Sequence, residues 1–323
     1  MYLKSIPRCI IDLVNIKLKV QDDQAVFTEN VLKKFENIKE GIPLLIPAHK
    51  KIFIFNRDDT FNLSPLRVLN TVYNLEDKNY IGFRTSFEKF IFLSRFKLKP
   101  SYHEVFNFVY QYNLDAINKI RNLKNIHNSL GAFQTRNIPH FGHEKIIETM
   151  LDRCDHLVIN PVIGPKKKGD VLIENLDYVF SNILSKKFYS KISFIPIFAN
   201  MFYAGPREAV HHAKLRTKLG FTHFSVGRDH AGAHNAYDPY LAPSLIDALK
   251  EEFEINVITH DGAYYCKKCC KVVLKGHCNH NKKFLEDISG SSFRDYLQRS
   301  QIYKFADKKV QSYIIKNKEH IFQ

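Results

Sequence analysis

The chain has 323 residues, of which 45% are hydrophobic, so it is long enough for two or three packed units with substantial cores. No apolar run approaches the roughly 20 residues that a membrane helix needs, and the first residues lack the layout of a secretory signal, so we expect a cytoplasmic protein with no membrane partner. The formal net charge is +15, carried by lysines spread over the whole chain. Such diffuse charge suits small anionic substrates better than nucleic acid, and it can also be compositional drift.

Two patterns of hydrophobic residues divide the chain. Residues 1–125 contain short apolar runs between polar turns, which favours a mostly β N-terminal domain, with a strand over residues 42–54. From residue 126, predicted strands alternate with predicted helices; the strands are 130–133, 156–159, 192–197, 221–226 and 255–259, and the helices are 143–153, 205–219 and 243–253. This alternation predicts a parallel α/β sheet with helices on both faces. We expect an N-terminal domain at 1–125, an α/β domain at 126–260 and a C-terminal subdomain at 261–323.

The segment QTRNIPHFGH, residues 134–143, leaves a predicted strand and enters a helix. Arg136 offers a planar guanidinium to an oxyanion, and Gln134 and Asn137 add neutral donors. His140 and His143 stand at the start of the helix, where the backbone favours negative charge. Two histidines there could instead merely cap the helix, so the segment by itself indicates an anion site without identifying the anion.

Two further polar segments follow predicted strands, at the edge of the sheet where ligands bind in such folds. MFYAGPREA, residues 201–209, opens a helix, although a glycine and proline before a charged first turn are also simply a good helix start. GRDHAG, residues 227–232, places Arg228, Asp229 and His230 directly after a strand. A structural ion pair is the alternative to ligand binding there.

In this order and at these separations, the three segments resemble ATP sulfurylase (sulfate adenylyltransferase), a family of the HxGH nucleotidyltransferase superfamily. PVIGPKKKGD, residues 161–170, is similar to another segment of that family, and ISGSSFR, residues 288–294, to one that opens a helix near the phosphates. The resemblance implies a Rossmann-like parallel-sheet core and a PUA-like, mostly β N-terminal domain. It implies the reaction of ATP with sulfate to adenosine 5′-phosphosulfate and pyrophosphate, as in sulfate assimilation.

The resemblance also implies roles for single residues. The catalytic residues would be Arg136, Asn137, His140, His143 and Arg228. The residues that hold sulfate would be Gln134, Arg136, Arg228 and Ala231. The nucleotide would contact Thr135, Asn137, His140, His143, Met201, Gly227, Arg228, Asp229, His230, Ser289 and Arg294, although Ser289 could be only a helix cap. Mg²⁺ would arrive with ATP rather than in a carboxylate cage of the protein.

A cluster of cysteines predicts a metal site in the C-terminal subdomain. The expected ligands, three thiolates and one imidazole, are Cys266, Cys269, Cys278 and His280. This is the composition of a structural zinc site, and some bacterial and archaeal ATP sulfurylases resemble the chain here. Cys270 and His277 are competing ligands, and a group of reduced thiols without metal is the alternative. Four protein ligands leave no open position, so we expect the metal to be structural.

Several positions depart from the pattern of the family. Phe202 stands where arginine is usual, Phe141 and Gly142 replace an arginine and an alanine, and the segment after Gly232 is shorter. We do not find the family's N-terminal motifs in residues 1–125. These departures leave open an adenylyltransferase for another oxyanion, and, as a different class, a non-catalytic zinc and RNA-binding protein. The second alternative gives no reason to keep the anion-binding constellation.

Other properties are excluded or left open by the same motifs. No phosphate-binding P-loop sequence occurs, so a fused adenylylsulfate kinase is not expected. The expected partners are ATP, sulfate and pyrophosphate. A homo-oligomer is compatible with the sequence, which determines neither the oligomeric state nor the direction of flux.

Overall fold

The computed structural model describes residues 44–46, 51–53, 102–163, 171–199, 204–228, 230 and 237–317, with backbone alone for 44–46, 51–53, 102–111 and 198. The single strand expected at 42–54 is instead two short antiparallel strands, β1 (Leu44–Ile46) and β2 (Lys51–Phe53). The apolar stretch is interrupted in the sequence by Pro47, His49 and Lys50, and a proline with polar neighbours disfavours one continuous strand.

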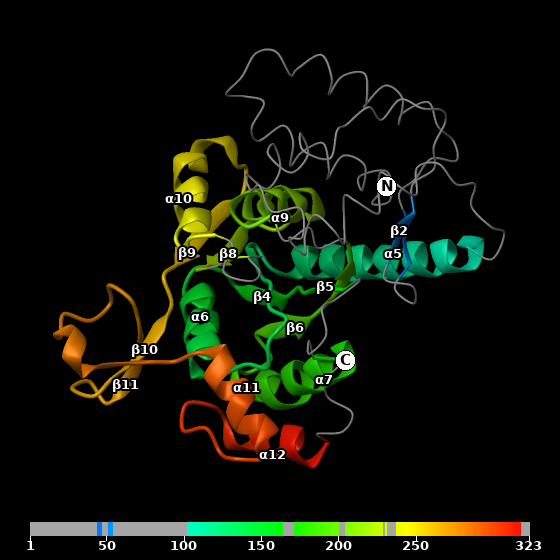
Figure 1. Cartoon of the computed structure of the whole chain (residues 1–323). Coiled ribbons are helices and arrows are strands. Elements are labelled where there is room, and N and C mark those ends of the chain that lie inside the picture. The colour runs from blue at the N-terminus through cyan, green and yellow to red at the C-terminus, as the bar shows by residue number, and fades with distance from the viewer. Residues whose placement is uncertain are drawn as a thin grey trace.

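The centre of the fold is a parallel sheet of five strands in the order β6-β4-β3-β8-β9 (Figure 1). Its strands are β3 (Leu130–Phe133), β4 (His156–Ile159), β6 (Ile192–Phe194), β8 (His223–Gly227) and β9 (Asn256–His260). Every residue of β3 and β4 is buried, as expected for strands covered on both faces. The predicted parallel α/β sheet is confirmed.

The strand order reverses between β3 and β8. From β3 the chain winds outward through β4 to β6, and it then returns to place β8 on the other side of β3, with Ala132 paired to Phe224. Ligands of open α/β sheets bind outside the carboxyl ends of the strands at such a switch point. The segments 134–143 and 227–232 follow these two strands, so the topology brings them together.

Helices cover both faces of the sheet. Figure 1 shows α9 (Pro206–Leu219) and α10 (Leu241–Ala248) on one side, and α6 (Phe141–Leu151) and α7 (Ile173–Tyr178) on the other. The chain continues from α7 through a π-helix, η6 (Val179–Leu184), and a short α8 (Ser185–Lys187). A small parallel pair, β5 (Val162–Ile163) with β7 (Ile197–Phe198), extends from the carboxyl ends of β4 and β6. A 3-10 turn, η7 (Lys250–Glu252), follows α10.

A glycine stands at each end of α9. Gly205, with φ +53°, is its N-cap, and Pro206 occupies its first turn. Gly220 closes the helix in the left-handed conformation at φ +91°, which glycine adopts without a steric penalty. These two residues define where α9 begins and ends.

One long helix lies inside the region expected to be mostly β. α5 (Tyr102–Ile126) has 25 residues and precedes β3. Its buried side chains Asn113, Ala116 and Ile120 are three and four positions apart, so they lie on one face of the helix. Its first residues, YHEVFNFVY, include aromatic and β-branched types that also favour strands, so the helix does not stand out in the sequence. Among the described residues, no helix combines the length and apolar character needed to cross a bilayer.

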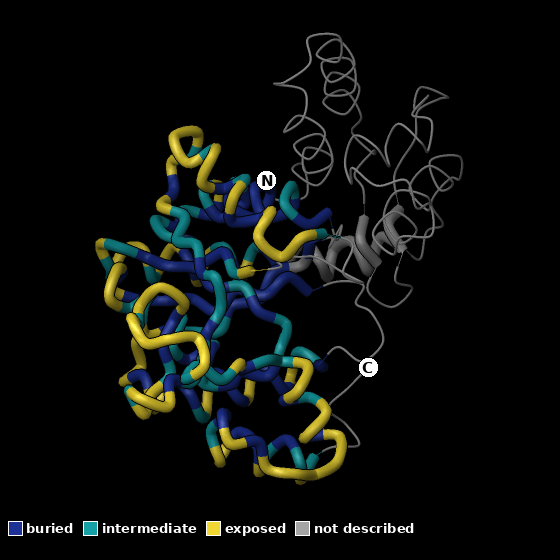
Figure 2. The backbone as a smooth tube through the Cα atoms, turned by 60° about the vertical axis from the view of Figure 1, so that its left-hand side comes forward, coloured by how far each residue is buried: buried dark blue, intermediate teal, exposed yellow. Residues whose placement is uncertain are grey.

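The C-terminal part consists of a small sheet and two helices. β10 (Ala263–Cys266), β11 (Lys271–Leu274) and β12 (Leu285–Asp287) form an antiparallel sheet in the order β11-β10-β12, with a 3-10 turn, η8 (Lys282–Phe284), before β12. The helices α11 (Gly290–Gln298) and α12 (Lys308–Lys316) then pack Phe293, Leu297 and Ile314 into the main core. The small sheet lies to one side of the main body (Figure 1), and exposed residues are concentrated in the outer loops of the molecule (Figure 2). The domain boundaries near residues 125 and 260 stay predictions.

Candidate functional site

A cavity of about 330 Å³ lies at the carboxyl ends of the central strands. Loops after β3, β8 and β9 contribute to its wall, together with the first turns of α6 and α11. The residues that sequence analysis singled out and that line this cavity are Gln134, Thr135, Arg136, Asn137, His140, His143, Gly227, Arg228, His230 and Ser289. Segments more than 150 residues apart in the chain therefore meet here, as the switch point requires.

The start of α6 is capped by the two histidines that face the cavity. Nδ1 of His140 accepts a hydrogen bond from the backbone N–H of Gly142 at 3.1 Å, and Nδ1 of His143 accepts one from the backbone N–H of His140 at 3.3 Å. A neutral imidazole that accepts at Nδ1 carries its proton on Nε2. Each ring thus stabilises the helix with one nitrogen and keeps an N–H donor on the other.

Burial holds both imidazoles in the neutral form. Desolvation lowers the pKa of His143 from its usual value to about 4. Desolvation, followed by the neighbouring His143, lowers the pKa of His140 well below its usual value. At neutral pH the pair therefore presents two uncharged Nε2–H donors to the cavity while both Nδ1 atoms stay in the helix cap.

Gly142 is needed for the packing of this helix start. A Cβ at this position would lie 2.9 Å from Cε1 of His140 and 3.1 Å from Cβ of Ala263. The missing side chain lets the His140 ring fold against the first turn while β10 closes over it. Sequence analysis noted that this residue departs from the family's usual alanine, and the structure supplies a steric reason for glycine.

The loop after β3 is braced from the C-terminal helix α11. Oγ1 of Thr135 accepts a hydrogen bond from the backbone N–H of Asn137 at 3.2 Å. Nη2 of Arg294 donates to Oδ1 of Asn137 at 3.4 Å, from a position outside the cavity wall. At the same end of α11, the hydroxyl of Ser289 accepts from the backbone N–H of Ser292 at 3.1 Å. Ser289 is thus the N-cap that sequence analysis considered, and it also lines the cavity.

His230 rests on a buried polar stripe of α9. Its Nε2 lies 3.0 Å from Nδ1 of His212, and Nε2 of His212 lies 3.5 Å from Oε1 of Glu208. Glu208, His212 and Arg216 are spaced by four residues and have no exposed surface, so one face of the helix carries a charged row into the core. The 3.5 Å contact is too long for a strong hydrogen bond, whereas the 3.0 Å contact between the two rings is a good one. Desolvation, and then Arg216 and Arg136, lower the pKa of His230 to about 3.

His260 was missed by sequence analysis. It ends β9 beside Gly227, its exposed fraction is 4%, and it lines the cavity. Its Nε2 is buried and has no hydrogen-bond partner in the described part of the chain. Burial lowers its pKa to about 4. Its place at the carboxyl end of a strand next to the switch point was the signal that could have identified it.

Three predicted contact residues cannot be located. Met201, Asp229 and Ala231 lie outside the residues that the structure describes, as does Phe202. Among the described residues, the wall of the cavity contains two arginines and four histidines and no carboxylate. This composition favours an anionic ligand.

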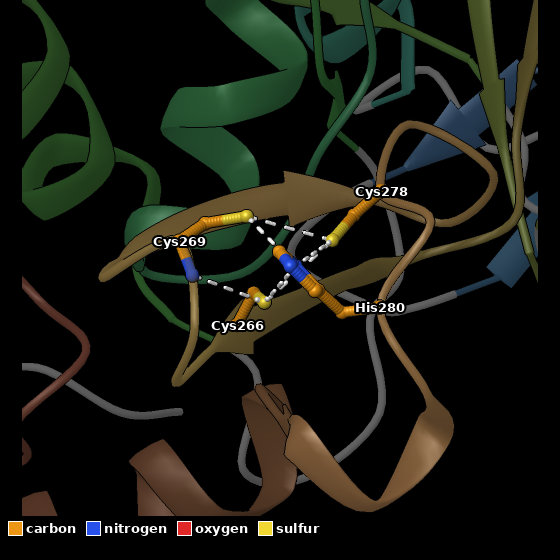
Figure 3. A group of neighbouring side chains, drawn as sticks. All are labelled: Cys266, Cys269, Cys278 and His280. Carbon is orange, nitrogen blue, oxygen red and sulfur yellow. Dashed lines mark hydrogen bonds between the residues drawn. The ribbon is translucent and has the colours of Figure 1, made fainter.

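Four side chains of the small C-terminal sheet form a compact group (Figure 3). Sγ of Cys278 lies 3.6 Å from Sγ of Cys266 and from Sγ of Cys269, and Nδ1 of His280 lies 3.3 to 3.5 Å from the three sulfurs. A tetrahedral zinc shell has edges of about 3.8 Å between sulfurs and about 3.5 Å from sulfur to nitrogen. The donor set and its dimensions therefore fit zinc.

The structure also separates these four from the competing ligands. Cys270 is exposed, has a φ of +53°, and directs its Sγ to the backbone oxygen of Lys267 at 3.5 Å. His277 is exposed and is not part of the group. The cluster consequently contains Cys266, Cys269, Cys278 and His280, with one ligand atom from each.

Comparisons with known proteins agree with this arrangement. The sequence matches the ATP-sulfurylase family over residues 117–316. It is 42% identical over 172 residues to the sulfate adenylyltransferase of Pyrococcus abyssi, covering 53% of this chain and 45% of that protein. It is 31% identical over 271 residues to that of Staphylothermus marinus, covering 83% and 70%, and 39% identical over 187 residues to that of Thermococcus onnurineus, covering 54% and 48%.

The share of each relative's length that the match covers differs from one relative to the next. The chain spans about half the length of most of the curated relatives it matches, such as those of P. abyssi and T. onnurineus. A solved structure, a hexameric APS kinase from Thiobacillus denitrificans, is similar over 62% of this chain and 39% of that chain, at a TM-score of 0.47 and 14% identity, and we draw nothing from a likeness at that level. The family match covers well over half of the sequence. The chain belongs to the ATP-sulfurylase family.

Proposed function

We propose that this chain is a sulfate adenylyltransferase, which transfers AMP from ATP to sulfate and releases pyrophosphate. The observation that carries the proposal is the convergence of Gln134, Arg136 and Arg228 with four neutral histidines in one cavity. The family membership supports it, since the relatives matched are sulfate adenylyltransferases.

The chemistry asks little of the protein in acid–base terms. A sulfate oxygen forms a bond to the α-phosphorus, the bond from that phosphorus to the bridging oxygen breaks, and its electron pair leaves with pyrophosphate. Sulfate carries no proton to remove, so no general base is required. The difficulty is to hold two mutually repelling anions in line and to stabilise the charge that develops between them.

The described residues divide into two groups that suit these tasks. Arg136 and Arg228 are charged forks for the oxygens of sulfate, and Gln134 adds a neutral donor. His140 and His143, with Asn137 beside them, lie at the start of α6, where backbone N–H groups favour phosphate. Each neutral ring would donate its Nε2–H to a phosphate oxygen while its Nδ1 stays in the helix cap. The assignments of Thr135, Gly227, His230, Ser289 and Arg294 to the nucleotide, and of Met201, Asp229 and Ala231, are part of the same proposal.

Two metals belong to the proposal. Mg²⁺ would come with ATP, because the described cavity wall offers no carboxylate to hold it. Zinc would be held by Cys266, Cys269, Cys278 and His280, where it would lock the small sheet without contacting substrate.

Product analysis tests this function. Purified protein is incubated with Mg-ATP, sulfate and a pyrophosphatase, and adenosine 5′-phosphosulfate is identified by mass spectrometry. We expect its formation by the wild type and its loss in Arg136→Ala and in Arg228→Ala. The matched control is Arg299→Ala, which removes an exposed arginine paired with Asp295 at 3.1 Å. A protein that forms an adenylylated product only with another oxyanion would refute sulfate as the acceptor.

A further inference from the structure

A chain of contacts links Arg228 at the cavity to the small sheet that carries the metal ligands. The guanidinium of Arg228 lies against Gly262, where a Cβ would be 3.7 Å from Cζ. Gly262 has a φ of +107°, so a larger residue would be strained there. The guanidinium also interacts with the phenol of Tyr240, and its charge lowers the pKa of that phenol; Tyr240 lies at the start of α10 and has an exposed fraction of 37%.

Lys275 reaches the same phenol from the other side. Its Nζ donates to Oη of Tyr240 at 3.3 Å and lies 4.5 Å from the centre of the ring. The same Nζ is 3.5 Å from Oδ2 of Asp261. The backbone N–H of Lys275 donates to the carbonyl oxygen of Gly262 at 3.1 Å. Tyr240 and the turn at Asp261 and Gly262 are therefore both held by Lys275.

Lys275 itself is fixed by the metal-binding hairpin. It directly follows β11, whose first residue comes just after Cys269 and Cys270. The next turn is closed by the backbone N–H of His277, which donates to the carbonyl oxygen of Leu274 at 3.0 Å, and Cys278 follows. Ligands before and after Lys275 thus anchor both ends of the segment that carries it.

We propose that Tyr240 is a positioning residue that directs the guanidinium of Arg228 into the cavity, and that Lys275 of the metal-binding hairpin holds Tyr240 for this task. The inference rests on the proposed function, because it assigns Arg228 to the acceptor oxyanion. A phenol oxygen has two lone pairs and can accept from both cations at once. Without it, the guanidinium at the open edge of the cavity is free to turn toward water. The small sheet would thus affect binding of the acceptor through the contact of Lys275 with Tyr240, and the metal itself would not touch the acceptor.

Steady-state kinetics of Tyr240→Phe tests this positioning role. The substitution removes one oxygen and keeps the ring. Loss of a charge-assisted hydrogen bond at a partly exposed site should raise the KM for sulfate about tenfold. The KM for ATP should stay within about twofold, since Arg228 is only one of many residues assigned to the nucleotide. Lys275→Met should produce a smaller rise of the same kind, and the double variant should not exceed Tyr240→Phe, because Lys275 acts through the phenol.

Two matched controls separate positioning from general damage. Tyr296→Phe removes a hydroxyl from a tyrosine of similar exposure, 39%, on α11. Lys271→Met removes an exposed lysine from the same hairpin. Both should leave the KM for sulfate unchanged, and all variants should keep the zinc content and the thermal midpoint of the wild type.

The outcomes are distinct. Unchanged constants in Tyr240→Phe, an equal rise in the two KM values, or a rise that accompanies loss of zinc or of thermal stability would each overturn the positioning role. Failure of the proposed function is visible earlier, in the wild type, as turnover that does not depend on sulfate.

Discussion

The backbone N–H of His140 donates to Nδ1 of His143 at 3.3 Å, so the second histidine of the pair caps the helix that the first one begins. Sequence analysis set helix capping and anion binding as alternatives for these residues. The positions of the two rings allow both roles, because each imidazole has two nitrogens and the cap uses only one of them. The cap uses Nδ1, and the donor left for a ligand is Nε2. Helix stability and activity can therefore be separated by substitution.

Asparagine at position 140 should separate them. Asparagine is a good N-cap, so His140→Asn should change the free energy of unfolding by less than about 0.5 kcal/mol, whereas His140→Ala should cost about 1 kcal/mol. Both variants lose the Nε2–H donor, so both should lower sulfate-dependent turnover about a hundredfold. Urea unfolding and product formation measure the two effects. If His140→Asn were stable and fully active, the imidazole would have no part in the reaction.

Acid should destabilise the protein through its buried histidines. The pKa of His143 is lowered by burial to about 4 and that of His230 to about 3, so in the unfolded chain these rings take up protons near pH 6.5 while the folded protein does not. The contribution is complete above pH 6.5 and is lost as the pH falls toward 4. Each such histidine contributes a slope of about 1.4 kcal/mol per pH unit in that window.

Urea titrations between pH 7.5 and pH 4.5 would show this slope. His143→Gln should flatten it, since glutamine can still accept at the cap and does not titrate. His127→Gln is the control, because that ring precedes β3 at the opposite end of the sheet, where it stacks on His156. A wild-type stability that is constant over this range would contradict the neutral, buried state of the pair.

Removal of the metal should unfold the small sheet first. We expect about one zinc per chain, and a strong chelator should lower the thermal midpoint, because structural zinc contributes directly to folding free energy. Cys266→Ser should lose the metal. Cys270→Ser is a matched control four residues away and should keep it, since Cys270 lies outside the cluster. Equal loss of zinc in the two variants would disprove the ligand set.

His212 should matter for the cavity although it does not line it. His212→Phe removes the partner that lies 3.0 Å from Nε2 of His230, and we expect turnover to fall about tenfold through loss of that orientation. His211→Phe is the control, since His211 is also buried on α9 and any damage from a larger ring would be shared. Similar turnover in the two variants would argue that the stripe on α9 is only structural.

Elements with local signals in the sequence could be predicted, whereas features that depend on tertiary contacts could not. The strands β3, β4, β8 and β9 are apolar runs bounded by polar loops, and α9 carries Gly205, Pro206 and Gly220 at its ends, so these elements could be predicted. The π-helix η6 could not, because its residues have the same pattern as an ordinary helix. α5 was missed because its aromatic and β-branched residues suit short strands as well as a helix.

The residues of the site also fall into a group that could be predicted and a group that could not. Its motif residues are contiguous in sequence and could be proposed from a resemblance. His260, Tyr240 and Gly262 could not, because their importance comes from the pairing of β8 with β9 and from the fold of the small sheet over the cavity. The choice of Cys269 over Cys270 likewise depends on a backbone conformation, the positive φ of Cys270, that the spacing of cysteines does not reveal.

The central claim is that this cavity joins sulfate to the α-phosphate of ATP. The most direct test is the exchange of labelled pyrophosphate into ATP by the wild type, measured with and without sulfate. We predict exchange that saturates with sulfate and is absent without it. Exchange that proceeds equally in the absence of sulfate would contradict the account.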